Sequence, residues 1–404
     1  MSSTRQDRIA ATIGAEAVRA TGDGRLIVTP TSTEAMAGVL GLAHDEQWQV
    51  AIEGGGSWRV DAPPADLTLS TRGLDDRLGI EHTDESVTAP AGVSLDLLRH
   101  TLRDEHGWVA LDPPGRTDRT VGSVLATATA GPLRAGFGPV RDQVLAMTIA
   151  TGDGRVVRLA RDEGSPTVTP AMRLHLGGFG GFGVITEATL RVRPLPDADL
   201  TWVALGSRDR LSAAARGLGE HHIAAAAAEL ISPALASEPE WLLAVRLMGS
   251  RDEVLQEGQR LSRVAHLHWH ELPPERRVLL WNGSSRGISS VPVTFRLGVL
   301  PEGIDEAIDA VVSLLGEGML SAGALAGSIR WSGHTTAEQL RAVRNQFAAR
   351  EVPLTLERAS WALRRTVGHF GAYREGIGGP IDRLRERHDP RHIFVTGITG
   401  EATS

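Results

Sequence analysis

The chain has 404 residues, too many for a single hydrophobic core, so about two or three domains are expected. Its 42 basic and 49 acidic residues give a net charge of -7, which offers no electrostatic basis for binding nucleic acid or an acidic membrane surface. All the basic residues are arginine and no cysteine is present, so lysine Schiff-base enzymes, disulfides, thiolate zinc sites and cysteine-held iron–sulfur clusters are excluded.

The sequence shows no pattern typical of membrane insertion or secretion. No apolar run reaches about 18 residues, so no transmembrane segment is expected. Residues 1–19 lack the apolar stretch of a secretory signal. These features predict a cytoplasmic location.

The first half of the chain predicts short strands separated by helices. Strands are expected at Leu26–Thr29, Gln49–Ile52, Leu67–Ser70, within 78–90, in a hairpin over Gln143–Ala160, and in the stretch that ends at Pro196. The spacing of apolar residues predicts helices over Thr33–Glu46, with Thr33 as N-cap, and over Leu95–His106.

Residues 197–380 have a different pattern, in which strands and amphipathic helices follow one another as strand–helix–strand–strand–helix. This order predicts an antiparallel sheet covered by helices on one face. The expected class is α+β. We expect a two-part first domain over 1–196, a second α+β cap domain over 197–380, and a segment, 381–404, that returns to the first domain.

Three glycine-rich segments carry the functional argument. IEGGGSW (Ile52–Trp58) follows a strand, and its consecutive glycines allow backbone N–H groups to converge on an anion such as a pyrophosphate. It lacks the GxGxxG pattern and a following long helix, which argues against a Rossmann phosphate site. PPGRTDRTVGS (Pro113–Ser123) combines rigid prolines with small hydroxyl donors. GFGGFGVITEATLRVRP (Gly178–Pro194) would let a flat ring lie against the backbone.

In this order and spacing, the three segments resemble the FAD-binding domain of the vanillyl-alcohol oxidase / p-cresol methylhydroxylase (PCMH-type) superfamily, over about Leu26–Pro196. Within it, Gly131–Arg158 is most similar to the FAD-binding subunits of bacterial glycolate oxidases. The resemblance implies an FAD-dependent oxidoreductase acting on the CH–OH group of a small 2-hydroxy acid. It also implies a homologous larger flavin subunit as partner, with an iron–sulfur subunit as a further one.

The resemblance also assigns residues to FAD. The pyrophosphate is assigned to the first segment, and the flavin to the second and third, with an Arg-Asp pair before the hairpin. The assigned residues are Gly54, Gly55, Gly56, Ser57, Trp58, Pro114, Gly115, Thr120, Gly122, Ser123, Arg141, Asp142, Gly183, Val184 and Ile185.

The sequence departs from the superfamily at several positions. Covalent members place a histidine at the end of the glycine loop, where this chain has Ser57 and Trp58, so non-covalent FAD is predicted. The metal-binding histidine motifs of the hydroxy-acid dehydrogenases are missing; Ser328–Thr336 keeps only His334, and no metal is predicted. Val395 and Thr396 replace an Asn-Pro pair near the C-terminus, which indicates a relaxed site.

Oxidation of a 2-hydroxy acid needs a base and a clamp for the carboxylate. Arginine suits the clamp because its guanidinium binds a carboxylate in a bidentate manner. The candidates are Arg296, Arg330 and Arg364, with His334 as base. The alternating histidines of HLHWH (266–270) would share one strand face, but no acidic partner matches them, so we interpret them as metal-free. His369 is expected to be exposed or hydrogen-bonded.

Three hypotheses remain open. The chain is the flavin subunit of a glycolate oxidase-like complex, a stand-alone FAD-dependent D-2-hydroxy-acid dehydrogenase, or a structural subunit that has lost the flavin. The missing metal motif favours the first over the second, and the retained glycine loops favour the first over the third.

Overall fold

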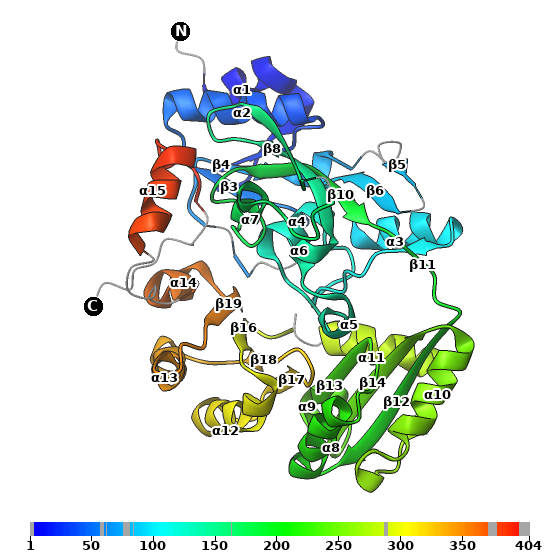
Figure 1. Ribbon diagram of the computed structural model, residues 1–404. Coiled ribbons are helices and arrows are strands. Elements are labelled where there is room, and N and C mark those ends of the chain that lie inside the picture. Colours follow the sequence, from blue (N-terminus) through cyan, green and yellow to red (C-terminus); the bar gives the residue numbers. More distant parts are fainter. Residues whose placement is uncertain are drawn as a thin grey trace.

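The computed structural model describes residues 4–56, 60–61, 63–75, 81–83, 85–162, 164–286, 290–370 and 378–395. In Figure 1 the elements up to β10 form the upper part of the molecule, and those from β12 to α13 form the lower part. The C-terminal helix α15 (Gly378–His388) lies beside the upper part.

The first sheet has four strands and is covered by two helices. Its order is β1-β2-β4-β3, in which β2, β4 and β3 run parallel and β1 is antiparallel to β2. The elements are α1 (Arg5–Ile13), β1 (Val18–Ala20), β2 (Leu26–Val28), α2 (Thr33–Glu46), β3 (Val50–Glu53) and β4 (Leu67–Ser70). The predicted N-cap of α2 is wrong by one residue, because the side chain of Ser32, not Thr33, accepts a hydrogen bond from Ala35 N at 3.1 Å.

The second sheet has five antiparallel strands in the order β5-β6-β10-β8-β9. Its strands are β5 (Glu81–His82), β6 (Ser86–Pro90), β8 (Val144–Ala150), β9 (Val156–Ala160) and β10 (Val184–Arg191), with β7 (Gly107–Trp108) and β11 (Arg193–Pro194) as a separate pair. The helices are α3 (Leu95–Asp104), α4 (Val121–Thr127), α5 (Arg134–Phe137), α6 (Val140–Gln143) and α7 (Pro170–His175). The predicted hairpin is confirmed, and the strand region 78–90 lies partly outside the described residues.

The third sheet, called the cap sheet below, has eight antiparallel strands in the order β15-β12-β14-β13-β17-β18-β16-β19. The strands are β12 (Ala198–Gly206), β13 (Ala227–Ile231), β14 (Trp241–Gly249), β15 (His270–Glu271), β16 (Val293–Gly298), β17 (Met319–Gly323), β18 (Ser328–Gly333) and β19 (Leu354–Arg358). The helices are α8 (Arg208–Glu220), α9 (Pro233–Ala236), α10 (Arg251–Leu261), α11 (Pro274–Arg286), α12 (Ile304–Leu315), α13 (Ala337–Ala348) and α14 (Trp361–Val367). The predicted antiparallel sheet is therefore confirmed.

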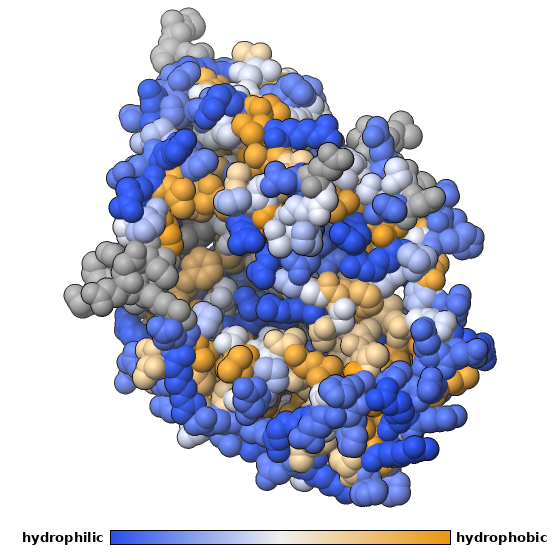
Figure 2. Space-filling view, viewed as in Figure 1, coloured by the Kyte–Doolittle hydropathy of each residue, from blue (hydrophilic) through white to orange (hydrophobic). Residues whose placement is uncertain are grey.

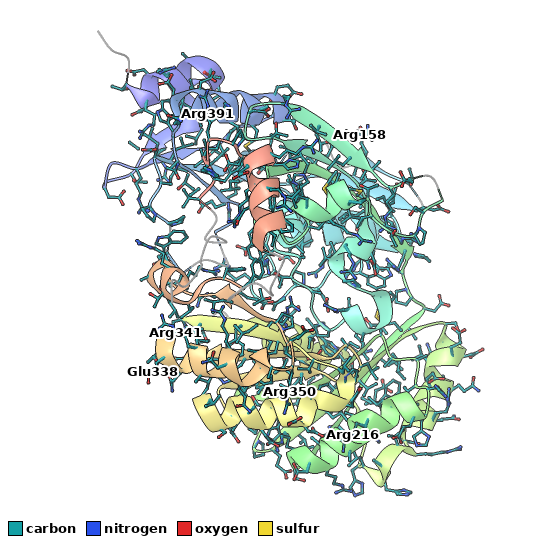
Figure 3. All side chains as sticks on the ribbon, turned by 60° about the vertical axis from the view of Figure 1, so that its left-hand side comes forward. Arg158, Arg216, Glu338, Arg341, Arg350 and Arg391 are labelled. Carbon is teal, nitrogen blue, oxygen red and sulfur yellow. The ribbon has the colours of Figure 1, made fainter. Side chains whose placement is uncertain are left out.

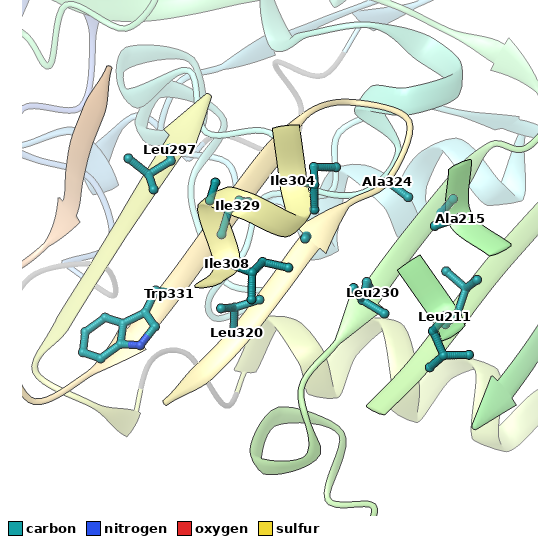
Figure 4. Packing of buried hydrophobic residues seen from close by; sticks show 14 of the residues in the cluster. Leu211, Ala215, Leu230, Leu297, Ile304, Ile308, Leu320, Ala324, Ile329 and Trp331 are labelled. Carbon is teal, nitrogen blue, oxygen red and sulfur yellow. The ribbon is translucent and has the colours of Figure 1, made fainter. Parts of the chain in front are cut away.

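The two faces of the cap sheet differ in chemistry. Leu230, Leu297, Ile329 and Trp331 point to the face covered by α8, α10, α12 and α13, where they form one apolar core (Figure 4). The four-residue helix α9 and the longer helix α11 add a smaller apolar cluster elsewhere in this half, around Ile231.

Side chains alternate across a strand, so the neighbours of these apolar residues point to the opposite face. They include Glu229, Arg296, Arg330 and Glu357. This face meets the first half of the chain, since Arg330 Nη2 donates to Ala130 O at 3.1 Å. The fold therefore places charged side chains between the two halves.

The chain returns to the first sheet near its C-terminus. Val50 N donates to Ile393 O at 2.7 Å, and Val395 N donates to Val50 O at 2.9 Å. The side chain of Asp389 accepts from Ile393 N at 2.9 Å and from Phe394 N at 3.0 Å, which fixes the turn before this pairing. The boundaries at 196 and 380 stay a prediction.

Candidate functional site

A cavity lies between the two halves of the chain. The empty space within it, including its open mouth, is about 1130 Å³. Its wall is built from β3 and the turn after it, from α4, from the segment before β10, and from residues 357–364 and 395. In Figure 2 hydrophilic side chains gather in the hollow between the upper and lower parts.

The glycine turn after β3 forms one side of the cavity. A Cβ atom at Gly54 would collide with Thr120 Oγ1 and lie 3.0 Å from Ser123 Cβ, so only glycine allows this close approach. Thr120 caps α4, because its side chain accepts from Ser123 N at 3.3 Å. The turn and the start of α4 therefore expose backbone to the same space.

The segment before β10 forms the opposite side. Gly183 has φ +140, a value that L side chains rarely adopt, and a Cβ there would lie 2.8 Å from Ile149 Cγ2. Val184 and Ile185 follow at the start of β10 and line the cavity, although their side chains are buried. Bare backbone on both sides suits a large ligand that carries an anionic group and a flat ring.

The structure brings together most of the residues that the sequence assigns to a cofactor. Gly54, Gly55, Gly56, Gly122, Ser123, Gly183, Val184 and Ile185 line the cavity. Thr120 packs behind Gly54. Ser57 and Trp58 lie outside the described residues.

Besides Thr120, four assigned residues are not in the described wall of this cavity. The carbonyl of Pro114 accepts a hydrogen bond from Arg119 Nη1 at 3.0 Å. Gly115 lines a different depression, beside α3 and α11. Arg141 and Asp142 form an ion pair of 3.7 Å on α6, where both side chains are about half exposed.

Arg330 is buried and already bound to a carboxylate of the chain. Its Nε and Nη2 contact Glu357 Oε2 and Oε1 at 2.7 and 3.1 Å. Arg296 Nε lies 3.3 Å from the same Oε1. Because Glu357 lines the cavity, both predicted clamp residues reach the cavity wall through this carboxylate. Their role in catalysis stays a prediction.

His334, the predicted base, is exposed at the start of the loop after β18. It is not among the described residues that line the cavity. The structure therefore gives no geometric support to His334 as the base, while Arg364, a further clamp candidate, does line the wall.

Three guanidinium groups act on the single carboxylate of Glu357. Burial raises the pKa of Glu357, but the charge and hydrogen bonds of Arg330 and the charges of Arg296 and Arg119 outweigh it and hold the pKa below its usual value. Burial lowers the pKa of Arg119 to about 10, so this residue stays charged near neutral pH. The wall around Glu357 therefore carries excess positive charge.

A second carboxyl group of the cap sheet behaves differently. Glu229 on β13 is buried, and burial raises its pKa to about 8, with the charge of Arg330 opposing the rise. Near pH 7 Glu229 is largely protonated, so it does not neutralise the arginines.

Arginines on the outer side of the cap helices form ion pairs that are exposed to solvent, unlike the buried pair of Arg330 and Glu357. Figure 3 shows Arg216 and Arg350 among the helices of the lower part of the molecule. Arg216 pairs with Asp305 and Arg350 with Glu306, and the side chains of Arg350 and Glu306 are 48% and 64% exposed. These pairs are matched exposed counterparts of the buried pair.

Sequence reasoning missed several residues of the wall. Glu357, Arg119, Thr71, Asp61, Phe179 and Trp361 all line the cavity. A local signal exists for Glu357, which occupies a polar position in the alternating pattern of β19, but nothing local distinguishes Arg119 among so many arginines.

His369 is buried, not exposed, and it is hydrogen-bonded as expected, since Arg364 Nη1 donates to its Nδ1. It is 1% exposed, its ring lies 4.0 Å from that of Phe179, and its Nε2 has no hydrogen-bond partner among the described residues. Burial and the charge of Arg364 hold its pKa well below the usual value, so it is neutral.

The histidines of HLHWH do not share a strand face. Residues 264–266 form a 3₁₀ turn, only His270 begins a strand, and His266, His268 and His270 are all exposed. In the described ranges no group of three or more His, Asp or Glu side chains is placed to hold a metal ion. Over the same ranges, no helix has the length and apolar composition required to cross a bilayer.

Curated proteins of known function align with part of this chain. The probable mitochondrial D-lactate dehydrogenase of Danio rerio is 27% identical over 184 residues, which are 43% of this chain and 36% of that protein. The glycolate oxidase subunit GlcE of Escherichia coli (strain K12) is 28% identical over 172 residues, 42% of this chain and 49% of that protein. The chain thus spans between about a third and a half of the length of these relatives.

A solved structure shares the fold over most of the chain. An alkyldihydroxyacetonephosphate synthase superimposes with a TM-score of 0.67 over 91% of this chain and 76% of that one, at 16% identity. This likeness shows the fold alone.

The family match covers the part of the chain that builds one of the backbone walls, the glycine turn and α4, but not the segment before β10. The sequence profile of an FAD binding domain matches residues 25–160. These residues include the glycine turn and α4, whose open backbone fits a dinucleotide cofactor. Residues 25–160 are therefore an FAD-binding domain of PCMH type, and the cofactor of the chain is FAD.

Proposed function

We propose that this chain is the non-covalent FAD-binding subunit of a hetero-oligomeric complex that oxidises a small 2-hydroxy acid, as in glycolate oxidases. Bound FAD would accept the hydride from the CH–OH carbon. The names of the relatives support the reaction class, since they include D-lactate dehydrogenases, a D-2-hydroxyglutarate dehydrogenase and a glycolate oxidase subunit. Cytoplasmic location and an iron–sulfur partner stay predictions.

The observation that carries this proposal is the excess positive charge around Glu357. Burying a charge without a counter-ion is unfavourable, and Arg296 and Arg330 share the single carboxylate of Glu357, so this pair favours an anionic ligand beside the cavity. Of the two arginines that contact Glu357, Arg296 is the more accessible: its side chain is 27% exposed, and that of Arg330 is 9% exposed. We assign Arg296 to the substrate carboxylate and Arg330 to holding Glu357.

The carboxylates of the wall support a role as one subunit of a larger assembly. Glu357 is engaged by arginines, Asp61 accepts from Trp361 N at 2.6 Å, and Glu53 also has a partner. No described histidine lines the cavity. A base for the substrate hydroxyl is thus missing from the described wall, which favours a partner subunit over stand-alone catalysis.

Non-covalent attachment is supported by the residue types of the wall. The chain has no cysteine, and the described lining contains neither histidine nor tyrosine. No described side chain of the wall is therefore a nucleophile of the usual kinds.

The test is the visible absorption spectrum of the purified chain, before and after anaerobic addition of glycolate, D-lactate or D-2-hydroxyglutarate. We expect flavin bands that the acids do not bleach, and bleaching after the partner subunits of the complex are added. Bleaching of the isolated chain would instead support the stand-alone dehydrogenase. A colourless protein that cannot take up FAD would support the flavin-less subunit.

A further inference from the structure

Two polar atoms in the cavity wall have no hydrogen-bond partner. Thr71, in the 3₁₀ turn after β4, is 5% exposed, and its Oγ1 is buried without a partner among the described residues. Trp361 opens α14, and its indole Nε1 is likewise buried and unpaired. Leaving a buried donor unsatisfied costs about 1–3 kcal/mol, and folded proteins rarely do so without a reason.

The location of these atoms separates them from other unpaired groups. His44 Nδ1 and Ser212 Oγ are also unpaired, but neither residue lines the cavity. Thr71 and Trp361 both do, and they come from the two different halves of the chain. A ligand in the cavity is therefore the natural partner for both.

Trp361 is held at this position by the first half of the chain. Asp61, five residues after the glycine turn, accepts a hydrogen bond from Trp361 N at 2.6 Å. Ser360 caps α14, since its side chain accepts from Leu363 N at 3.2 Å. The backbone of Trp361 is thus fixed at both the Asp61 contact and the start of the helix, so its indole ring is held in the wall.

We propose that Trp361 Nε1 and Thr71 Oγ1 are hydrogen-bonding contacts to FAD, and that Trp361, tethered by Asp61, lets the cap half of the chain retain the cofactor. The indole N–H can only donate, so it requires an acceptor atom of FAD. The threonine hydroxyl can donate or accept. The inference rests on FAD binding and holds for either catalytic alternative above.

The experiment is a titration of the full-length apoprotein with FAD, followed by quenching of flavin fluorescence. Trp361→Phe keeps the ring and removes the N–H, and Thr71→Val keeps the shape and removes the hydroxyl. Each should weaken the Kd for FAD by roughly three- to tenfold, the effect of one hydrogen bond. Trp108→Phe is the matched control, because Trp108 Nε1 already donates to Pro194 O at 3.0 Å outside the cavity, and it should leave the Kd unchanged.

The stability of the apoprotein separates a binding role from a structural one. Removing an unsatisfied donor should leave the Tm of the Trp361→Phe apoprotein equal to or above that of the wild-type apoprotein. Saturating FAD should raise the Tm of Trp361→Phe by less than it raises the Tm of wild type. Asp61→Ala should also weaken FAD binding, and its effect should not add to that of Trp361→Phe because both act through one contact.

A wild-type Kd for Trp361→Phe and Thr71→Val would overturn the proposal, as would a lower apoprotein Tm for Trp361→Phe with an unchanged Kd. Failure of the wild-type chain to bind FAD would instead refute FAD binding itself.

Discussion

Replacing Glu357 by glutamine should destabilise the protein strongly, because it leaves Arg330 charged and buried. The side chains of Glu357 and Arg330 are only 4% and 9% exposed, so solvent cannot take over the lost interaction. Removing one partner of such a pair costs about 3–5 kcal/mol. After the change, the hydrogen-bond partners of Arg330 in the described part of the chain are Ala130 O and whatever the glutamine amide offers.

The assay is urea denaturation of the apoprotein, followed by tryptophan fluorescence. Trp331, stacked on Phe295 in the core beneath β18, reports on the cap half directly. The matched control is Glu306→Gln, which breaks the exposed pair with Arg350 and should produce no measurable change. The double variant Glu357→Gln/Arg330→Gln should lose less than the sum of the two single variants, because neither charge is left alone.

The pH dependence has a definite sign. The pKa of Glu357 is lower in the folded state than in the unfolded state, so its contribution is complete above the unfolded value and is lost as the pH falls through the folded value. The stability difference between wild type and Glu357→Gln should therefore shrink in acid. Equal free energies of unfolding for Glu357→Gln and Glu306→Gln near pH 7 would refute this reasoning.

Three further outcomes follow from the geometry. Glu229 binds a proton in the folded state up to about pH 8. Glu229→Gln should therefore gain stability relative to wild type by roughly 1.4 kcal/mol per pH unit between about pH 5 and 8, measured by urea denaturation. A stability difference that does not change with pH would contradict a buried protonated carboxyl. Gly54→Ala should weaken FAD binding by at least roughly fivefold, because overpacking costs about 1–3 kcal/mol, whereas Gly22→Ala, with nothing within 4 Å of its Cβ, should not. Acid precipitation should release all the flavin into the supernatant, and yellow colour retained in the pellet would disprove non-covalent binding.

The part of the site that sequence could predict is the part made of backbone. A glycine turn after a strand is a local pattern, and Gly54–Gly56 and Gly183–Ile185 line the cavity as the resemblance implies. Local spacing also predicted α2, α3 and the hairpin within about two residues, because apolar periodicity and turn residues are properties of short segments.

The part that sequence could not predict depends on contacts between distant segments. The alternation of Leu354 and Leu356 shows that Glu357 faces away from the apolar core, but it does not show what lies opposite. Only the pairing of β16 with β18 and β19 brings Arg296, Arg330 and Glu357 together. The prediction of His334 as the base depends on the same kind of contact, since a loop position next to a cap strand does not reveal whether the side chain turns toward the cavity or toward solvent.

One part of the cavity wall is exposed backbone and another part is charged side chains of the cap sheet. This difference bears on how the substrate should be identified. The family match covers residues 25–160, where the glycine turn and α4 expose backbone to the cavity and the cofactor imposes the same requirement on any member. The cap sheet supplies the charged side chains, and there the likeness to a solved structure is one of fold at 16% identity. Side chains on a shared backbone can change without changing the fold, so substrate preference cannot be taken from the relatives' names. It has to be argued from Arg296, Arg330 and Glu357 themselves, and their excess positive charge selects for an acid.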